Sequence, residues 1–341
     1  MSTKIEWTDA TWNPVIGCTK VSPGCANCYA LPMARRLAGS AKNHPGSPTM
    51  QAYTRVVEDG RWCGATTIPS ALEQPLRWRK PRMVFVCSMG DLFHESVPFE
   101  FIAAVFGVMA ATPQHTFQVL TKRPEMMLEF LRWIEDDWRP NPAAQCMQYA
   151  IDAWPSREPD VLVDAEAPWP LPNVWLGVTT EDQQRADERI PLLLRCPAAV
   201  RFVSVEPMLG AVDLTEVGMG AVRFDALLGL GPRNIIPRPT KPSLDWVIVG
   251  GESGPGARPM HPDWARSLRD QCQAAGVSYF FKQWGAWAHH SQWEQMKDTD
   301  KRLIDYAAEL RDASAWLRVG KKAAGRILDG RTWDEMPGRA S

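Results

Sequence analysis

The sequence predicts an α/β fold, a partial (β/α) barrel of about six or seven mainly parallel strands with loop insertions. Short apolar, β-branched runs alternate with helical patterns, which is typical of parallel sheets. Polar and charged residues gather directly after the runs, where parallel β/α folds carry their sites. The length of 341 residues allows one large α/β domain, so we expect residues 1–341 to form a single domain.

Seven segments have the composition of buried strands. Each is an apolar run rich in β-branched or aromatic residues and is followed by a polar cluster or a turn. We expect the first segment to open the barrel sheet and the cysteine-rich loop to follow it. The segments are NPVIG at residues 13–17, MVFVCS at 83–88, TFQVLT at 116–121, VWLGVT at 174–179, RFVSVE at 201–206, DWVIVG at 245–250 and VSYFFK at 277–282.

Helical patterns lie between these strands. The last pattern begins with Pro262, which suits the first turn of a helix, and ends before Gly276. An earlier helix should begin at or near Pro32, or be kinked there, because proline lacks the N–H that a helix interior needs. The four patterns lie near residues 99–111, 124–137, 182–195 and 262–275.

Three stretches interrupt the strand–helix rhythm, at residues 39–70, 139–172 and 210–243. Because the rhythm resumes after each of them, we interpret them as insertions or lids and not as linkers between domains. Residues 286–341 follow the last predicted strand and form a C-terminal extension.

Composition and charge exclude several classes of protein. The formal net charge of −1 argues against a generally basic nucleic-acid binder but allows local basic patches. Residues 1–9 are polar and lack the apolar segment of a signal peptide, and the longest apolar run, residues 101–111, is about half the length of a membrane-spanning helix. We therefore predict a cytoplasmic protein without membrane contact. Its eight cysteines are then thiols, metal ligands or redox groups and not a disulfide framework.

The cysteines divide into two groups. Cys18, Cys25 and Cys28 lie in the segment GCTKVSPGCANCYA, whereas the other five are scattered singly and are expected to pack as small buried hydrophobes. Glycine and proline in the segment favour a tight loop that turns three thiolates toward one metal site. Closed zinc sites and electron-transfer clusters have four protein ligands, so three leave one metal position open. The alternative is a structural zinc site with Cys63 or His44 as the fourth ligand.

Charged and amide side chains follow the predicted strands, at the edge where we expect the site. Glu206 ends a strongly apolar strand, where a buried carboxylate needs a partner, and Lys282 ends the last strand; both are candidate catalytic residues. Glu181, for which helix capping is the alternative, and Glu252 in the loop GGESGPG are candidate cofactor-binding residues. The whole set comprises Asp91, Lys122, Arg123, Glu181, Glu206, Glu252, Lys282 and Gln283.

Three cysteines in a loop after the first strand of a partial barrel resemble the radical S-adenosylmethionine superfamily. From about Ile5 to Pro337 the chain is similar to one branch of it, the phage-associated three-Cys-motif family of unknown function, first named from phage gene products thirty-seven and sixty-eight. The segments that carry the resemblance are IEWTDATWNPVIGCTKVSPGCANCYA, VFVCSMGDLFHE, VLTKRPE, WLGVTTE, RFVSVEPM, VIVGGESG, FFKQWG and GKKAAGRILDGRTWDEMP.

The resemblance implies a partial barrel of the radical-SAM type and a particular chemistry. Cys18, Cys25 and Cys28 would hold three irons of a [4Fe–4S] cluster, and S-adenosylmethionine would chelate the fourth through its amino and carboxylate groups. Reduction of the cluster by an external electron donor would cleave the sulfonium carbon–sulfur bond. The resulting 5′-deoxyadenosyl radical would remove a hydrogen atom from the substrate.

The resemblance also adds cofactor contacts. Residues 88–91 lie where the superfamily places the segment that binds the methionine amino group, so Ser88 and Asp91 join the candidate cofactor-binding residues. Two features depart from the commonest superfamily pattern: the first cysteine spacing is longer, and Tyr29 follows the last cysteine instead of preceding it. The triplet GGE lies at residues 250–252, after a later strand.

Phage association and the radical class suggest modification or repair of a nucleic acid or a nucleotide-derived substrate. Residues 77–82 combine basic side chains with Trp78, as phosphate contact and base stacking require. A second basic stretch suited to phosphate contact comprises Arg318, Lys321, Lys322, Arg326 and Arg331. A partner protein is compatible with this function. The alternatives are a zinc-stabilised, non-catalytic nucleic-acid-binding accessory protein and an electron-transfer module, which the chain length and the polar edge disfavour.

Overall fold

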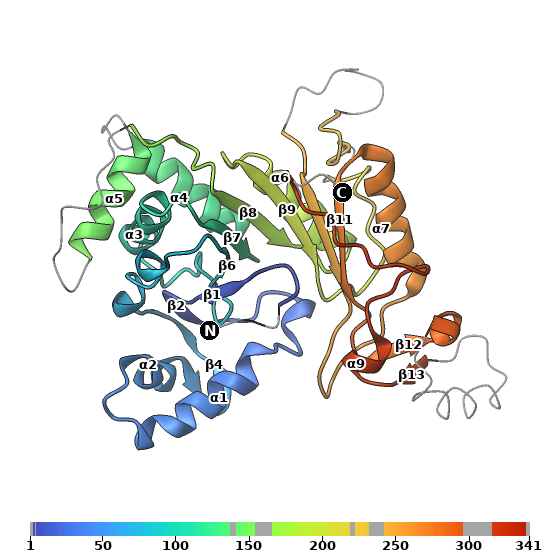
Figure 1. Ribbon diagram of the computed structural model, residues 1–341, viewed down its shortest axis with the longest axis horizontal. Coiled ribbons are helices and arrows are strands. Elements are labelled where there is room, and N and C mark those ends of the chain that lie inside the picture. The colour runs from blue at the N-terminus through green and yellow to red at the C-terminus, as the bar shows by residue number, and fades with distance from the viewer. Residues whose placement is uncertain are drawn as a thin grey trace. The chain divides into compact units, whose positions relative to one another are not determined.

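The computed structural model describes residue 3 and residues 5–136, 141–153, 166–218, 222–231, 242–295 and 316–338. Seven strands form one sheet in the order β1-β6-β7-β8-β9-β10-β11 (Figure 1). The chain therefore has the predicted α/β fold with a parallel sheet of partial-barrel type. The strands are β1 (Ala10–Trp12), β6 (Met83–Val86), β7 (Thr116–Thr121), β8 (Val174–Thr179), β9 (Val200–Val205), β10 (Trp246–Gly250) and β11 (Ser278–Gln283).

All seven predicted segments contain a strand, but the first one does not open the main sheet as expected. The opening strand of the sheet is β1, which pairs in parallel with β6. The predicted segment 13–17 instead contributes to β2 (Val15–Cys18), which pairs antiparallel with β5 (Gly64–Thr67) in a separate ladder. Both segments bury apolar side chains, but Pro14 separates them and has no N–H with which to continue a ladder.

The chain divides into two compact units. Unit 1 comprises Met1–Val21, Cys28–Val178 and Arg195–Arg201, and unit 2 comprises Ser22–Asn27, Thr179–Leu194 and Phe202–Ser341. The three predicted metal-ligating cysteines are thus distributed, with Cys18 and Cys28 in unit 1 and Cys25 in unit 2. Each unit is described by itself below.

Unit 1 covers its strands with α3 (Phe99–Ala110), α4 (Pro124–Asp136) and α5 (Pro142–Asp152). Helix α3 is buried over nearly its whole length and packs closely on α5 (Figure 1). The Phe130 ring of α4 lies 5.1 Å from Phe106 and 6.1 Å from Phe93, measured between ring centroids. The strong apolar content of these segments thus produces a continuous aromatic core.

A smaller subdomain of unit 1 contains α1 (Ala30–Ser40) and α2 (Pro48–Val56), which lie side by side (Figure 1). Both pack with β2 around a small core that includes Tyr53 and Ile16. Helix α1 begins near Pro32, as predicted, because proline is tolerated in the first turn. A short ladder of β3 (Val57–Glu58) and β4 (Arg61–Trp62) follows α2.

Unit 2 contains most of β9 and all of β10 and β11, with α6 (Gln183–Leu193) and α7 (Pro262–Ala275). Helix α7 begins at Pro262 and ends at Gly276 with φ +68°, as predicted. Asp182 caps α6 by accepting a hydrogen bond from the Arg185 N–H. The C-terminal extension adds β12 (Trp287–His289), β13 (Trp316–Arg318) and α9 (Lys321–Ala324), of which β12 and β13 pair antiparallel.

The predicted interruptions are not all loops. Residues 39–70 contain α2 and β3 to β5, and residues 139–172 contain α5. Parts of the interruptions and of the C-terminal extension, namely residues 139–140, 154–165, 219–221, 232–241, 296–315 and 339–341, lie outside the described residues. Over the part of the chain that is described, no helix combines the length and the apolarity needed to cross a membrane.

Candidate functional site

The cysteines differ in burial in a way that separates the predicted ligands from most of the others. Cys18, Cys25 and Cys28 are partly exposed. Four of the scattered cysteines are buried, and burial raises their pKa, for Cys196 to about 12. Cys63 is the exception, because it is exposed and does not pack as predicted. The remaining three buried cysteines are Cys87, Cys146 and Cys272.

Cys18 is the last residue of β2 and follows Gly17, whose φ is +88°. A side chain at position 17 would strike the carbonyl of Gly64 and the side chain of Val56, so only glycine fits there. The β2–β5 ladder therefore sets the backbone at Cys18. The thiol points toward Arg123, whose Nη1 lies 3.5 Å from Sγ.

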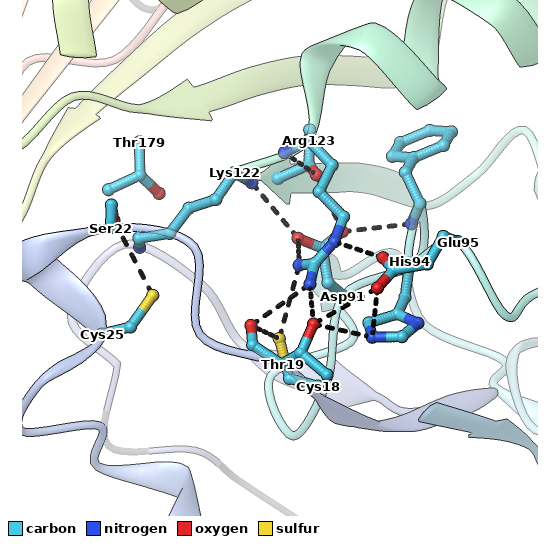
Figure 2. A network of polar contacts seen from close by, with 12 residues as sticks. Cys18, Thr19, Ser22, Cys25, Asp91, His94, Glu95, Lys122, Arg123 and Thr179 are labelled. Carbon is cyan, nitrogen blue, oxygen red and sulfur yellow. Dashed lines mark hydrogen bonds and ion pairs between the residues drawn. The ribbon is translucent and has the colours of Figure 1, made fainter. Parts of the chain in front are cut away.

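Arg123, the second residue after β7, is the centre of a polar network around Cys18 (Figure 2). Its Nε donates to Glu95 Oε2 at 3.0 Å, and its Nη2 donates to both oxygens of Thr19, to Oγ1 at 2.6 Å. Burial alone would lower the pKa of this guanidinium, but Asp91 and Cys18 raise it above its ordinary value. The charge is therefore permanent, and it lies beside the sulfur of a predicted metal ligand.

Asp91, a candidate cofactor-binding residue, is buried and has protein partners on both oxygens. Oδ1 accepts from the Thr121 hydroxyl at 2.7 Å and from the Phe93 N–H at 3.1 Å. Oδ2 accepts from Arg123 Nη1 and from the Lys122 N–H, both at 3.2 Å. In this structure the carboxylate thus holds Arg123 and the loop after β6 in place.

His94 extends the network through Thr19. Its Nδ1 accepts from the Ser96 N–H at 3.2 Å, and its Nε2 lies 3.1 Å from the Thr19 hydroxyl. Acceptance at Nδ1 places the proton of the neutral ring on Nε2. Burial, and then the charge of Arg123, lower the pKa of His94.

Ser88, the second candidate from the loop after β6, contacts the residue that follows Cys28. Its carbonyl accepts from the Tyr29 hydroxyl at 2.6 Å, and its own hydroxyl donates to Asn13 Oδ1 at 3.2 Å. Cys28 itself packs against the small core beneath α1. The Tyr29–Ser88 bond thus fixes the start of α1 on the loop after β6.

The segment Ser22–Asn27, which carries Cys25, is held in unit 2 by two buried carboxylates. The first is Glu181, which is fully buried. Glu181 accepts from the Ser22 hydroxyl and from Arg189 Nη1, the latter at 2.9 Å. A side chain at Gly24 would collide with Glu181, so glycine lets the segment lie directly against the carboxylate.

The second carboxylate is Glu252 in the loop after β10. Arg258 donates to it in a forked arrangement, from Nη2 to Oε1 at 2.8 Å and from Nε to Oε2 at 2.9 Å. Asn27 Nδ2 donates to the same Oε2 at 3.0 Å, and Arg258 Nη2 also reaches the carbonyl of Pro23 at 3.1 Å. Burial would raise the pKa of Glu252, but the bonds from Arg258 and Asn27 lower it.

The two candidate catalytic residues form an ion pair at the ends of β9 and β11, the strands on either side of β10. Lys282 Nζ lies 2.8 Å from each oxygen of Glu206, and Gln283 Nε2 lies 3.3 Å from Oε1. Gln283 is buried, and its Oε1 has no hydrogen-bond partner among the described residues. An unsatisfied buried acceptor is expected to receive a donor from a water or a ligand.

Within each unit, the structure brings some of the predicted residues together. In unit 1 it joins Cys18 to Asp91 through Arg123, and in unit 2 it joins the Cys25 segment to Glu181 and Glu252. Within the described residues, no group of three or more His, Cys, Asp or Glu side chains is arranged to hold a metal ion. His44 and Cys63, the alternatives for a fourth zinc ligand, are both exposed.

Three positioning residues escaped the sequence analysis, namely Asn27, Arg189 and Arg258. Each one pairs with a carboxylate that the sequence did mark. The sequence indicated only that a buried carboxylate needs a cationic partner. The spacing of the residues does not say which arginine is that partner.

Fold and clusters define an α/β protein with a partial-barrel sheet and a cysteine segment anchored by buried carboxylates. Over residues 2–337 the chain matches the model of a family described as Protein of unknown function (DUF5131). The chain belongs to this family. No curated protein and no solved structure matched it.

Proposed function

We propose that this protein is a radical S-adenosylmethionine enzyme whose Cys18, Cys25 and Cys28 hold a [4Fe–4S] cluster. The observation that carries the proposal is the anchoring of the cysteine segment. Ser22 and Asn27, which flank Cys25, are fixed by the buried carboxylates of Glu181 and Glu252. A short segment fixed in this way is what a preorganised ligand loop needs.

The donor set supports a cluster in preference to an ordinary structural role. The three thiols are partly exposed and lie within one short stretch of the chain, unlike the four buried cysteines whose pKa is raised. Arg123 Nη1 lies 3.5 Å from Cys18 Sγ, and a neighbouring cation is an environment typical of metal-binding and reactive cysteines. Three thiolates leave one iron open for S-adenosylmethionine.

When bound, the cluster supplies the electron that cleaves the sulfonium bond of S-adenosylmethionine. The chain's own residues position the parts. Arg123 orients Cys18, while Glu181 and Glu252 orient the Cys25 segment. Ser88, next to the Tyr29 contact, remains the candidate for binding the methionine portion of S-adenosylmethionine.

Glu206 and Lys282 are assigned to the substrate. Lysine carries three N–H donors, two of which are directed at Glu206, so the third can be donated to a substrate oxygen. The buried Gln283 Oε1 can accept a hydrogen bond from a substrate N–H or O–H. This pattern of donor and acceptor suits a polar, hydrogen-bonding substrate.

We further propose that the substrate is a nucleic acid or is derived from a nucleotide, that an external donor supplies the electron and that the enzyme is cytoplasmic. Of the basic stretches predicted to bind phosphate, Arg79, Lys80, Lys321 and Lys322 are exposed, which supports contact with phosphate. Trp78 packs against Arg82, with its ring centroid 5.1 Å from the guanidinium carbon, and against His115, so it supports the fold more than it supports base stacking.

The test is the production of 5′-deoxyadenosine. Protein purified anaerobically and reconstituted with iron and sulfide is mixed with dithionite and S-adenosylmethionine, and deoxyadenosine is measured by liquid chromatography. We expect production by the wild type and by Cys63→Ala, which removes an exposed cysteine outside the segment. We expect Cys28→Ala to abolish it.

Stoichiometric zinc in the purified protein, with no deoxyadenosine in any variant, would contradict the proposal. It would favour the zinc-stabilised accessory protein instead. Equal loss in Cys63→Ala and Cys28→Ala would show that the loss reflects general damage to thiols and not a cluster site.

A further inference from the structure

The N-terminal part of the chain has an unusual distribution of charge. Between Asp9 and Glu58 there is no acidic residue. The same stretch contains five lysines and arginines, in a chain whose net charge is −1. This stretch of the sequence is therefore locally basic. The five basic residues are Lys20, Arg35, Arg36, Lys42 and Arg55.

Helix α1 displays part of this charge on one side. Ala30 and Ala34 are buried in the small core of unit 1, and Leu31 is buried as well. Met33 and Arg36 are exposed, and they follow Tyr29 at intervals of four and three residues, so the three share one face of the helix. We call Tyr29, Met33, Arg35 and Arg36 the α1 face; Arg35 borders the stripe and is exposed as well.

An aromatic ring is fixed on this face. Tyr29 is 62% exposed, and its hydroxyl donates to the Ser88 carbonyl at 2.6 Å. Because the hydroxyl is tethered, the ring is held in one orientation while much of its surface meets solvent. Met33, one turn along, is 43% exposed. A rigid exposed ring beside an apolar side chain is a preformed surface for stacking.

The charge of the α1 face comes from its two arginines. Arg35 Nε donates to the carbonyl of Gly60 at 2.6 Å, which orients the guanidinium without cancelling its charge. Throughout the described part of the chain, neither Arg35 nor Arg36 forms an ion pair with a carboxylate. Both guanidiniums can therefore bind an anion.

We propose that the α1 face binds single-stranded nucleic acid, with a base stacked on Tyr29 and backbone phosphates on Arg35 and Arg36. A fixed aromatic ring beside unpaired guanidiniums is the combination that single-stranded nucleic acids require. Bases inside a duplex are already stacked and cannot use the ring, so a single strand is favoured. The inference rests on the proposed function, for which it names the substrate class.

The test measures fluorescence anisotropy of a labelled oligothymidylate with the full chain. We expect Tyr29→Ala to weaken binding by about 5- to 100-fold and Tyr29→Phe, which keeps the ring, to weaken it much less. Arg36→Glu should weaken binding and reduce the slope of log Kd against log salt by about 0.7. Arg195→Glu, which reverses an exposed arginine outside the acid-free stretch, serves as the matched control.

Several outcomes would overturn the inference. One is the absence of oligothymidylate binding at low salt; another is equal binding by Tyr29→Ala, Arg36→Glu and the Arg195→Glu control. Tighter binding of a duplex of the same length is a third. Reduction by an acidic electron-transfer protein that fails in Arg36→Glu, with oligothymidylate binding unchanged, would assign the face to a protein partner. Circular dichroism melting of each variant identifies misfolded protein.

The inference and the proposed function fail in different ways. Deoxyadenosine production without oligothymidylate binding would refute nucleic-acid binding by the α1 face and support the proposed radical chemistry. Oligothymidylate binding that needs Tyr29, in a protein that produces no deoxyadenosine, would support nucleic-acid binding by the α1 face and refute the proposed radical chemistry.

Discussion

Arg123 connects the predicted metal ligand Cys18 to the carboxylates of Asp91 and Glu95 through one guanidinium. The side chains of Arg123 and Asp91 are each only 7% exposed, so their ion pair is shielded from water. Removing one partner of a buried pair leaves the other charge without compensation. Arg123 therefore stabilises the fold through Asp91 in addition to contacting the Cys18 thiol.

We expect Arg123→Met to lower the free energy of unfolding by about 3–5 kcal/mol, because Asp91 would remain buried and unpaired. Urea denaturation of the metal-free protein measures the change. Arg79→Met, which removes an exposed arginine, is the control and should change stability by less than about 0.5 kcal/mol. A similar small change in both variants would show that the pair contributes little.

His94 predicts a pH dependence of stability. Burial lowers its pKa in the folded state below the ordinary value of 6.5, so the unfolded chain binds the proton more readily. The contribution of His94 to stability is complete above the unfolded pKa and is lost as the pH falls below it. We expect the free energy of unfolding to decrease between about pH 7 and pH 5, and to decrease less in His94→Gln. Equal slopes in the two proteins would refute this assignment.

The burial of the cysteines predicts their reactivity. In the reduced, metal-free protein, iodoacetamide should modify exposed Cys63 fastest and the three partly exposed cysteines of the segment next. The four buried cysteines should react only after unfolding, because burial raises their pKa and blocks access. Peptide mass spectrometry over time gives the order. Early modification of Cys146 or Cys272 would contradict the packing described here.

At the scale of elements, the loop after β10 and the cysteine segment act together in unit 2. Arg258 holds Glu252 with a fork of two bonds and reaches the carbonyl of Pro23. Hydrogen bonds to charged groups contribute about 1.5–3 kcal/mol each, so their loss should loosen the segment without unfolding the unit.

We expect Arg258→Met to accelerate amide hydrogen exchange of Ser22–Asn27 by about ten- to hundredfold. Arg266→Met is a matched control, since Arg266 pairs with Asp263 and Asp329 elsewhere in the same unit. In Arg266→Met, hydrogen exchange of Ser22–Asn27 should stay at the wild-type rate. Unchanged exchange in Arg258→Met would mean that Glu252 does not anchor the cysteine segment.

Most strands could be predicted from the sequence, because an apolar run rich in β-branched residues by itself indicates a buried strand. The exception, β1, has only the three residues Ala10–Trp12, too few for a pattern, whereas the more convincing run of β2 pairs outside the main sheet. Pairing partners depend on the fold and not on local composition. The first strand therefore required the structure.

The candidate site was predictable in part for a similar reason. The sequence marks Glu181 and Glu252 because carboxylates after apolar strands are conspicuous. It does not reveal that both carboxylates contact the cysteine segment. Glu181 is paired with Arg189, which lies on a helix, and Glu252 is contacted by Asn27, which is far away in the sequence, so neither partner is evident from local sequence. The exposed ring of Tyr29 was also hidden, because sequence does not give exposure.

At the scale of the whole molecule, the near-neutral net charge conceals a local asymmetry. The chain carries 38 basic and 39 acidic side chains, yet the stretch between Asp9 and Glu58, which includes the three cysteines, contains no acid. In the folded chain, the acids that contact this stretch come from elsewhere in the sequence, because Ser22 and Asn27 bind the carboxylates of Glu181 and Glu252. The exposed arginines of the α1 face, Arg35 and Arg36, would supply the phosphate contacts of the proposed nucleic-acid binding.

The central claim is that the three cysteines bind a [4Fe–4S] cluster with one iron open to S-adenosylmethionine. The most direct measurement is electron paramagnetic resonance of the dithionite-reduced, reconstituted protein before and after addition of S-adenosylmethionine, with iron and sulfide determined on the same sample. We predict about four irons and four sulfides per chain and a reduced-cluster signal that changes on addition. A signal that S-adenosylmethionine leaves unchanged, or zinc in place of iron, would contradict the claim.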